Sequence, residues 1–456
     1  MCRTWRAIAF FLVLGLGTTW LLAFGIWKRT TGPLVLLGEE PEFDLQQYWG
    51  AYSPYFSVED YTTPPHGCEI TQVNILQRHG ARFPTFGAAV SIASAVQKLQ
   101  SVDVYTHPAM DFLPSFVYTL GINDLVPFGA QQSFDSGALV FERYSHLIDA
   151  DNLPFVRASS GDRVVQSARN WTQGFSFASH HVYKPRLSVI LSEEGNNTLE
   201  NHMCPNAGSS DVQTAEWLAV YAPATTARLN SWAPGANLTD PETYSLISLC
   251  AFHTIASATE GQIDRLSPFC DLFAETDFEA FEYSGDLDKY YGTGYGDALG
   301  PVQGVGYTNE LIARLTRTAV HDHTQTNATL DADPATFPLN RTIYADFSHD
   351  NTMIAIFSAM GLFPQPRPLA TAGPDVVRTW RTSWMVPFAG RMVVEKMACG
   401  VRGREYVRIL VNDAVQPLEF CAPNEVGVGL CELSAFVQSQ AYARNNGGGD
   451  WEKCFS

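Results

Sequence analysis

Two junctions between a strand-like and a helix-like segment stand out in the pattern of apolar and polar positions. Residues 70–77 (ITQVNILQ) form a β-type run, and the apolar positions of residues 88–99 recur about every 3.6 residues. Further along, residues 342–347 (TIYADF) again indicate a strand, which leads through residues 348–351 (SHDN) into the apolar stretch 352–362. Each junction places polar side chains where a strand is expected to end and a helix to begin.

The rest of the pattern alternates between the two kinds of element. Helix-like pieces and then strand-like pieces are found at residues 211–222, 241–258, 309–317, 391–396 and 406–411. Strands that alternate with helices are typical of an α/β fold. We therefore expect an α/β domain with a mostly parallel central sheet, and a smaller α-helical subdomain at about residues 195–300.

The first residues resemble a targeting signal. Residues 7–27 carry no charge, arginines precede them, and Lys28 and Arg29 follow. The run is long enough to remain in a bilayer, so an uncleaved signal anchor is our first interpretation; a signal peptide cleaved at AFG (23–25) is the alternative. The expected parts of the chain are a tail at 1–6, this leader at 7–27, a linker or wrapping arm at 28–65 and a folded domain at 66–456.

Sequons and cysteines indicate that the folded domain is exported. Of nine cysteines, only Cys2 precedes the apolar run, and the even number beyond it favours four disulfides without deciding which residues pair. Five asparagines begin an Asn-x-Ser/Thr sequon: Asn170, Asn196, Asn237, Asn327 and Asn340. We expect a protein of the secretory pathway with an extracellular or lumenal body, either membrane-anchored in type II orientation or secreted.

Composition excludes some classes of protein. The chain is 46% apolar and 17% charged, which is typical of a globular protein rather than a disordered one. Its formal net charge of −18 argues against a nucleic-acid binder, which needs a basic face. An anionic ligand would have to bind at a local basic cluster, and residues 78–84 (RHGARFP) at the first junction are such a cluster.

The residue types in this cluster suit phosphoryl transfer. Arg78 and Arg82 can donate paired hydrogen bonds to phosphoryl oxygens, and they stay charged at any working pH. A neutral His79 is a competent nucleophile toward phosphorus, and Gly80 allows the backbone to approach a ligand closely. A helix N-terminus just beyond a strand adds a favourable potential for an anion.

His349 and Asp350 at the second junction supply a complementary chemistry. An alkoxide that leaves phosphorus needs a proton, and a protonated Asp350 can donate it, which predicts an acidic pH optimum. His349 would hydrogen-bond the phosphoryl oxygens. The nearby His-Asp-His run at 321–323 is interpreted as a solvated loop, and the chemistry requires neither a metal nor a cofactor because arginines supply the positive charge.

Several stretches resemble a known family. RHGARFP (78–84) with SHDN (348–351), together with YWGAYSPYFSV (48–58), PFVRASSGDRV (154–164) and the run from 289 to 316, is similar to the histidine acid phosphatases and more similar still to fungal phytases. The resemblance covers about residues 47 to 456. It implies an α/β domain with a smaller α-helical domain, and a small phosphorylated substrate, with inositol hexakisphosphate as the best guess.

The resemblance also implies roles for single residues. His79 would be the nucleophile and Asp350 the proton donor, and the phosphoryl oxygens would be bound by Arg78, Arg82, Arg157 and His349. The implied disulfides are Cys68–Cys399, Cys204–Cys454, Cys250–Cys270 and Cys421–Cys431.

Departures from the fungal phytases concern the substrate more than the chemistry. Residues 85–97 contain no lysine, Asp288 stands where the first of two lysines is expected before Lys289, and Ser248 replaces an aspartate. Lost lysines would weaken binding of a polyphosphorylated ring. A broad-specificity acid phosphatase therefore remains an alternative, and so does an inactive membrane-tethered glycoprotein that binds phosphorylated ligands. A phosphoglycerate-mutase-type transferase shares the Arg-His-Gly start, but SHDN favours hydrolysis.

Overall fold

A computed structural model describes residues 43–259, 261–375, 377–421 and 429–456. The chain divides into two compact units, and the fold reported below is that of the second, Asp44–Ser456. The expected tail at 1–6 and leader at 7–27, and the linker up to residue 42, lie outside the described residues. Within the described ranges, no helix has the length and apolar character needed to span a bilayer.

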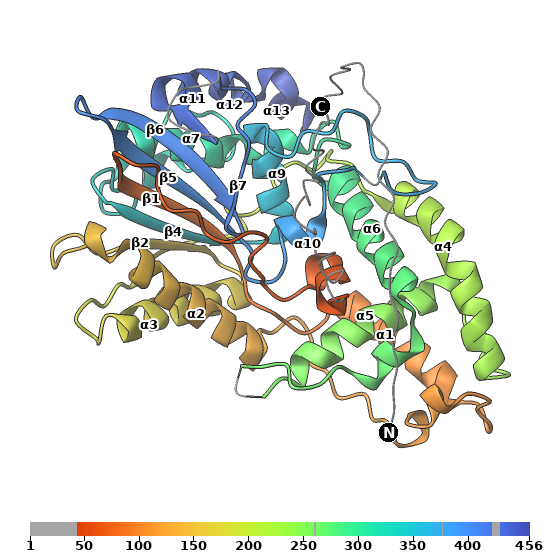
Figure 1. Cartoon of the computed structure of the whole chain (residues 1–456). Helices are drawn as coiled ribbons and strands as arrows, with labels where there is room; N and C mark the ends of the chain where they lie inside the picture. Colours follow the sequence, from red (N-terminus) through yellow and green to blue (C-terminus); the bar gives the residue numbers. More distant parts are fainter. Residues whose placement is uncertain (1–42, 260, 376, 422–428) are drawn as a thin grey trace, which may run out of the picture. The chain divides into compact units, whose positions relative to one another are not determined.

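A mixed β-sheet forms the centre of this unit (Figure 1). Its strands are β1 (Cys68–Arg78), β2 (Phe155–Ser159), β3 (Leu187–Leu191), β4 (Ile343–Ser348), β5 (Arg391–Cys399), β6 (Arg404–Val411), β7 (Ala414–Val415) and β8 (Leu430–Glu432). They lie in the order β3-β2-β4-β1-β5-β6-β7, with β8 beside β6. The expected α/β class is confirmed, but only β3, β2, β4 and β1 run parallel. From β5 onward neighbours are antiparallel. β5 and β6 are joined by a short turn without a crossover helix, and such a connection makes that pair antiparallel.

Two apolar cores lie on opposite faces of the sheet. Alternate strand residues such as Val73, Ile75 and Phe347 pack on one face with helices α2 (Pro127–Tyr144) and α3 (Asp162–Ala178). Leu76 and Tyr344, one residue out of phase, pack on the other face with α7 (Val305–Thr316) and α9 (Asp350–Met360). This follows from the period of two in a strand, which sends neighbouring side chains to opposite faces.

The longer helices are α1 (Phe86–Gln100), α2 (Pro127–Tyr144), α3 (Asp162–Ala178), α4 (Asp211–Trp232), α5 (Asp240–Ala256), α6 (Glu275–Gly292), α7 (Val305–Thr316) and α9 (Asp350–Met360); the shorter ones are α8 (Ala328–Ala332), α10 (Thr382–Met385), α11 (Leu433–Ser439), α12 (Ala441–Arg444) and α13 (Asp450–Lys453). Helices α1, α4, α5 and α6 contact one another and lie beside the sheet rather than over it (Figure 1). This group includes the helix-rich stretch expected near residues 195–300, and it also takes in α1 from much earlier in the chain.

Four disulfides are present in the described residues, and their pairs are those that the resemblance implies: Cys68–Cys399, Cys204–Cys454, Cys250–Cys270 and Cys421–Cys431. Cys68 and Cys399 are register partners on β1 and β5. Disulfides of this kind persist in oxidising compartments, which agrees with an exported protein.

Candidate active site

The two junctions of the sequence meet at one edge of the sheet. β1 and β4 are adjacent and parallel, and Arg78 at the end of β1 is in register with Ser348 at the end of β4. His79 and His349 are therefore the first residues beyond two neighbouring strands, and their ring centroids lie 5.6 Å apart. The carboxyl edge of parallel strands is the usual ligand site of an open α/β sheet.

His79 is buried, and hydrogen bonds to two backbone carbonyls fix its position. Its amide donates to the Ser348 carbonyl over 3.0 Å, and its Nδ1 lies 2.8 Å from the Gly80 carbonyl oxygen. Because a carbonyl only accepts, Nδ1 carries the proton and Nε2 keeps its lone pair. Burial and the adjacent Arg78 guanidinium hold the pKa of His79 well below its usual value. The imidazole is therefore neutral, as a nucleophile must be.

The arginines of the first junction present unpaired donors beside His79. Arg78 donates through Nη1 to the carbonyls of Ala51 and Val386. Among the described residues, its buried Nε and the Nε of Arg82 have no hydrogen-bond partner, and its Nη2 meets only the carboxylate of Asp350, in an ion pair of 3.3 Å. A buried unpaired donor costs about 1–3 kcal/mol. Burial lowers the pKa of Arg78 to about 10, so it remains charged at acidic pH. These donors suit the oxygens of a phosphoryl group.

Asp350 begins α9 and is paired with two cations. Its Oδ2 lies 3.3 Å from Nη2 of Arg78 and 3.0 Å from Nζ of Lys289. Burial alone raises the pKa of this carboxyl, but Arg78, Lys289 and His79 outweigh it and hold the pKa well below its usual value. Asp350 is thus a carboxylate in the free protein. Lys289, on α6, was not singled out by the sequence as a neighbour of Asp350.

His349 is held by two carboxylates that sequence reasoning missed. Its Nε2 lies 3.0 Å from Oε1 of Glu193 and 3.0 Å from Oε2 of Glu200. Burial lowers the pKa of His349, but these hydrogen bonds prevail and raise it. His349 also holds the pKa of Glu193 down, at about 2. The three side chains lie within 4.8 Å of one another, and an imidazole between two carboxylates accounts for that proximity without a metal ion.

Comparison with known proteins places the chain in a family. The sequence profile of the histidine phosphatase superfamily (branch 2) matches residues 69–412. The chain belongs to that superfamily. Among curated relatives, it is 42% identical to Phytase A of Aspergillus fumigatus over 426 residues, covering 90% of each chain. It is 39% identical to Phytase A of Neurospora crassa over 482 residues, covering 92% of this chain and 94% of the relative.

Solved structures share the fold of this histidine phosphatase. The phytase from D. castellii superposes with a TM-score of 0.74 at 22% identity, covering 92% of this chain and 90% of that one. A Bifidobacterium longum multiple inositol polyphosphate phosphatase gives a TM-score of 0.60 at 16% identity, covering 85% and 96%. At these identities the likeness shows the fold alone, and it confirms the α/β architecture with added helices.

The role expected for Arg157 does not fit its position. Arg157 lies within β2 and points to the same face as Asp346, its register partner on β4. Its Nε donates to Asp346 over 2.8 Å and its Nη2 to Glu310 of α7 over 2.5 Å. Arg314 pairs with the same Asp346. Arg157 is therefore one member of a buried ion network under the sheet, not a clamp for phosphate.

Arg163 occupies the position that Arg157 was expected to take. It lies in the first turn of α3, just beyond the end of β2, and its Nη2 is 3.2 Å from Nδ1 of His349. Its buried Nε has no hydrogen-bond partner in the part of the chain that the structure describes. A signal for Arg163 was present in the sequence. Like Arg82 at the first junction, Arg163 follows the end of a strand and does not lie within it.

Substitution of the two arginines should give opposite defects. Arg157→Ala leaves Asp346 and Glu310 short of a buried partner, so we expect the free energy of unfolding to fall by about 3–5 kcal/mol. Arg163→Ala should leave stability nearly unchanged and lower kcat/KM for an aryl phosphate by about 100-fold. Urea unfolding and steady-state kinetics measure both, and a stable, inactive Arg157→Ala protein would restore Arg157 to the phosphate site.

Gly80 matters for a reason that the sequence did not show. A Cβ on Gly80 would lie 2.1 Å from the carbonyl oxygen of Gly129, in the first turn of α2. Gly80→Ala should therefore separate β1 from α2 and displace the Gly80 carbonyl that orients His79, lowering stability by about 1–3 kcal/mol and activity more than stability. Gly87→Ala is the matched control, since nothing lies within 4 Å of its Cβ position. Equal behaviour of the two variants in thermal unfolding would contradict the close contact.

Proposed function

We propose that the protein is a phytase that hydrolyses phosphomonoesters of inositol through a phosphohistidine at acidic pH. The observation that carries the proposal is the neutral, buried His79, which keeps a lone pair on Nε2 and lies close enough to Arg78, Arg163 and Arg82 for their charges to lower its pKa. The superfamily and the phytase relatives, at about two-fifths identity over nine-tenths of the chain, support the substrate class.

In the first step, the three arginines bind the phosphoryl oxygens at the N-terminus of α9, beside His349, which is held by Glu193, Glu200 and Arg163. The lone pair of His79 Nε2 attacks phosphorus, and a P–N bond forms as the bond between phosphorus and the ester oxygen breaks. The departing alkoxide takes a proton from Asp350, so that the alcohol leaves neutral.

Asp350 must gain that proton after the substrate binds. In the free protein Arg78 and Lys289 favour its carboxylate form. A bound phosphate adds negative charge beside Asp350 and draws the Arg78 guanidinium to itself, and both effects raise the pKa of the carboxyl. Since protons are taken up on binding, kcat/KM should fall as the pH rises.

In the second step, water attacks phosphorus and the P–N bond breaks. The Asp350 carboxylate accepts a proton from that water, which restores neutral His79 and releases inorganic phosphate. The positive charge that stabilises the phosphoryl oxygens in this scheme comes from Arg78, Arg82 and Arg163, and the N-terminus of α9 adds a favourable potential.

The test is phosphate release at acidic pH from 4-nitrophenyl phosphate and from inositol hexakisphosphate. A phytase releases phosphate from both. A large preference for the aryl ester, with almost no release from the hexakisphosphate, would favour the broad-specificity acid phosphatase, and no release from either would favour a protein that only binds phosphorylated ligands.

We also propose that the enzyme works in the secretory pathway. The four disulfides support an oxidising compartment. The sequon asparagines Asn196, Asn237 and Asn340 are exposed, and Asn170 on α3 and Asn327, the N-cap of α8, are half-buried. Whether the leader at 7–27 remains as a membrane anchor is decided by N-terminal sequencing of the mature protein.

A further inference from the structure

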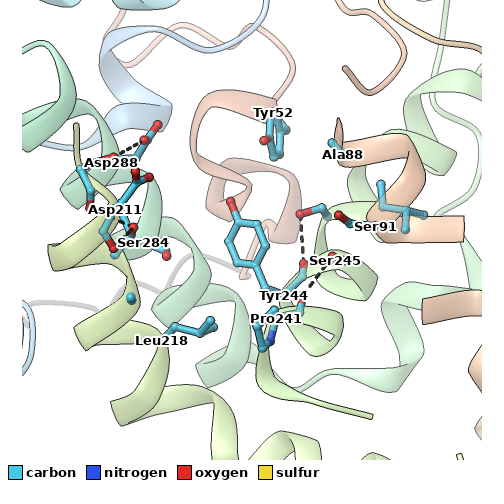
Figure 2. A pocket seen from close by; sticks show the side chains of 15 residues that line it. Tyr52, Ala88, Ser91, Asp211, Leu218, Pro241, Tyr244, Ser245, Ser284 and Asp288 are labelled. Carbon is cyan, nitrogen blue, oxygen red and sulfur yellow. Dashed lines mark hydrogen bonds between the residues drawn. The ribbon is translucent and has the colours of Figure 1, made fainter. Parts of the chain in front are cut away.

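A cavity of about 400 Å³ opens between α1, α4, α5 and α6 (Figure 2). Figure 2 shows Asp211, Asp288 and Ser284 on one side, Ala88 and Ser91 on the other, and Tyr52 and Tyr244 between them. No described residue that lines the cavity is a lysine, arginine or histidine. The only charged groups of this lining are the two aspartates.

The cavity adjoins the catalytic groups at two points. Asp288 on its wall lies 3.1 Å from Nζ of Lys289, which in turn lies 3.0 Å from Asp350. The Tyr52 ring lies 6.4 Å from the ring of Phe388, over which the Arg78 guanidinium stacks at 4.5 Å. An ester whose phosphoryl group lies at His79 can therefore place its alcohol part in this cavity.

The hydrogen-bonding groups of the wall determine what it can bind. Four hydroxyls of the lining already donate their single hydrogen within the protein, to a backbone carbonyl or to Asp288: Ser210, Thr214, Ser245 and Ser248. They and the two carboxylates can only accept a further hydrogen bond. The other hydroxyls of the lining, those of Tyr52, Ser91, Tyr244 and Ser284, are neutral. Alcohol O–H groups can donate to the acceptors of this wall, whereas an ionised phosphate meets two carboxylates there and no cation.

Nearby lysines do not compensate for this lack of positive charge. Lys98, at the end of α1, is paired with Glu242 at 2.7 Å. Lys289 faces Asp350, Asp288 and Asn351. Both amines are thus engaged, and neither lines the cavity.

We propose that this cavity makes the enzyme select inositol phosphates with few phosphate groups over the hexakisphosphate, with Asp211 as a specificity-determining residue. The inference rests on the proposed function, because it assigns the cavity to the alcohol part of that reaction's substrate. Each additional phosphate on the ring meets a wall with two carboxylates and no cation, while each free hydroxyl meets acceptors to which it can donate.

The experiment compares kcat/KM for inositol monophosphate and inositol hexakisphosphate, with 4-nitrophenyl phosphate as reference, in the wild type and two pairs of variants. Asp211→Lys and Ala88→Lys add positive charge on opposite walls of the cavity. Glu216→Lys on α4 and Val90→Lys on α1 make comparable changes on the same helices at residues outside the lining. Ala88→Lys, with Val90→Lys as its control, keeps the test valid if Asp211→Lys, at a helix N-terminus, fails to fold.

We expect the wild type to favour the monophosphate. Each cavity variant should raise kcat/KM for the hexakisphosphate relative to the monophosphate by about fivefold, and the two controls should leave that ratio within about twofold. A wild type that favours the hexakisphosphate, or cavity variants no different from their controls, would overturn the selectivity. Failure of the proposed function is a separate outcome, in which none of the three esters releases phosphate.

Discussion

His79→Ala is expected to lower kcat by at least about 10⁴-fold on every phosphomonoester. The loss follows from geometry, because no other described side chain offers a neutral nitrogen among the arginine donors. Acid-quenched wild-type enzyme should retain labelled phosphate from a labelled ester, and the variant should retain none. Among the described residues the buried imidazole is hydrogen-bonded only to the Gly80 carbonyl, so the fold should survive its removal, which circular dichroism would verify.

The control for this trapping experiment is His349→Ala, which removes the other imidazole of the site. It should slow turnover but still form the labelled intermediate, since His349 is engaged with Glu193 and Glu200 rather than free to attack. Label that persists in His79→Ala and disappears in His349→Ala would reverse the assignment of the nucleophile.

Asp350→Asn is expected to discriminate between leaving groups. For glycerol 2-phosphate, whose alkoxide needs a proton, kcat should fall by about 10³-fold; for 4-nitrophenyl phosphate, whose phenolate leaves unaided, it should fall by about tenfold. The substitution also removes a charge next to Arg78 and Lys289. Because both esters carry the same phosphoryl group, that change affects them equally and cancels in the comparison.

The pH dependence of kcat/KM provides a second test of Asp350 as the proton donor. Its pKa is depressed in the free protein, so the carboxylate form predominates and the productive complex must take up a proton. The wild-type kcat/KM for glycerol 2-phosphate should therefore decline as the pH rises, and the Asp350→Asn profile should be flatter. An equal loss on both esters with an unchanged pH profile would mean that another group donates the proton.

The outline of the site was accessible from the sequence because it lies at two strand-to-helix junctions. The apolar runs before His79 and His349 have the period and length of strands, and parallel neighbours bring their carboxyl ends together. The α/β class and the helices after both motifs follow from the same periodicities. The antiparallel half of the sheet did not, since the position of β5 beside β1 depends on contacts between segments that are distant in the sequence.

The contributions of Arg157 and Arg163 show where sequence reasoning stops. Both lie in one short stretch, and only the end of β2 between them decides which points to the sheet face and which to its edge. A boundary uncertain by a few residues is enough to exchange their roles. Glu193, Glu200 and Lys289 come from a loop and a helix that only tertiary packing brings to the site.

The order of strands also has a consequence for how the enzyme matures. β1 is paired with β4 and β5, and its disulfide joins residues 331 positions apart in the sequence. Long-range pairings of this kind form late and slowly in folding. Catalytic competence therefore comes only with the last stages of folding, and newly made chains that still await β4 and β5 carry all of RHGARFP without any phosphatase activity. The time at which activity appears during refolding would then report when β4 and β5 pair with β1.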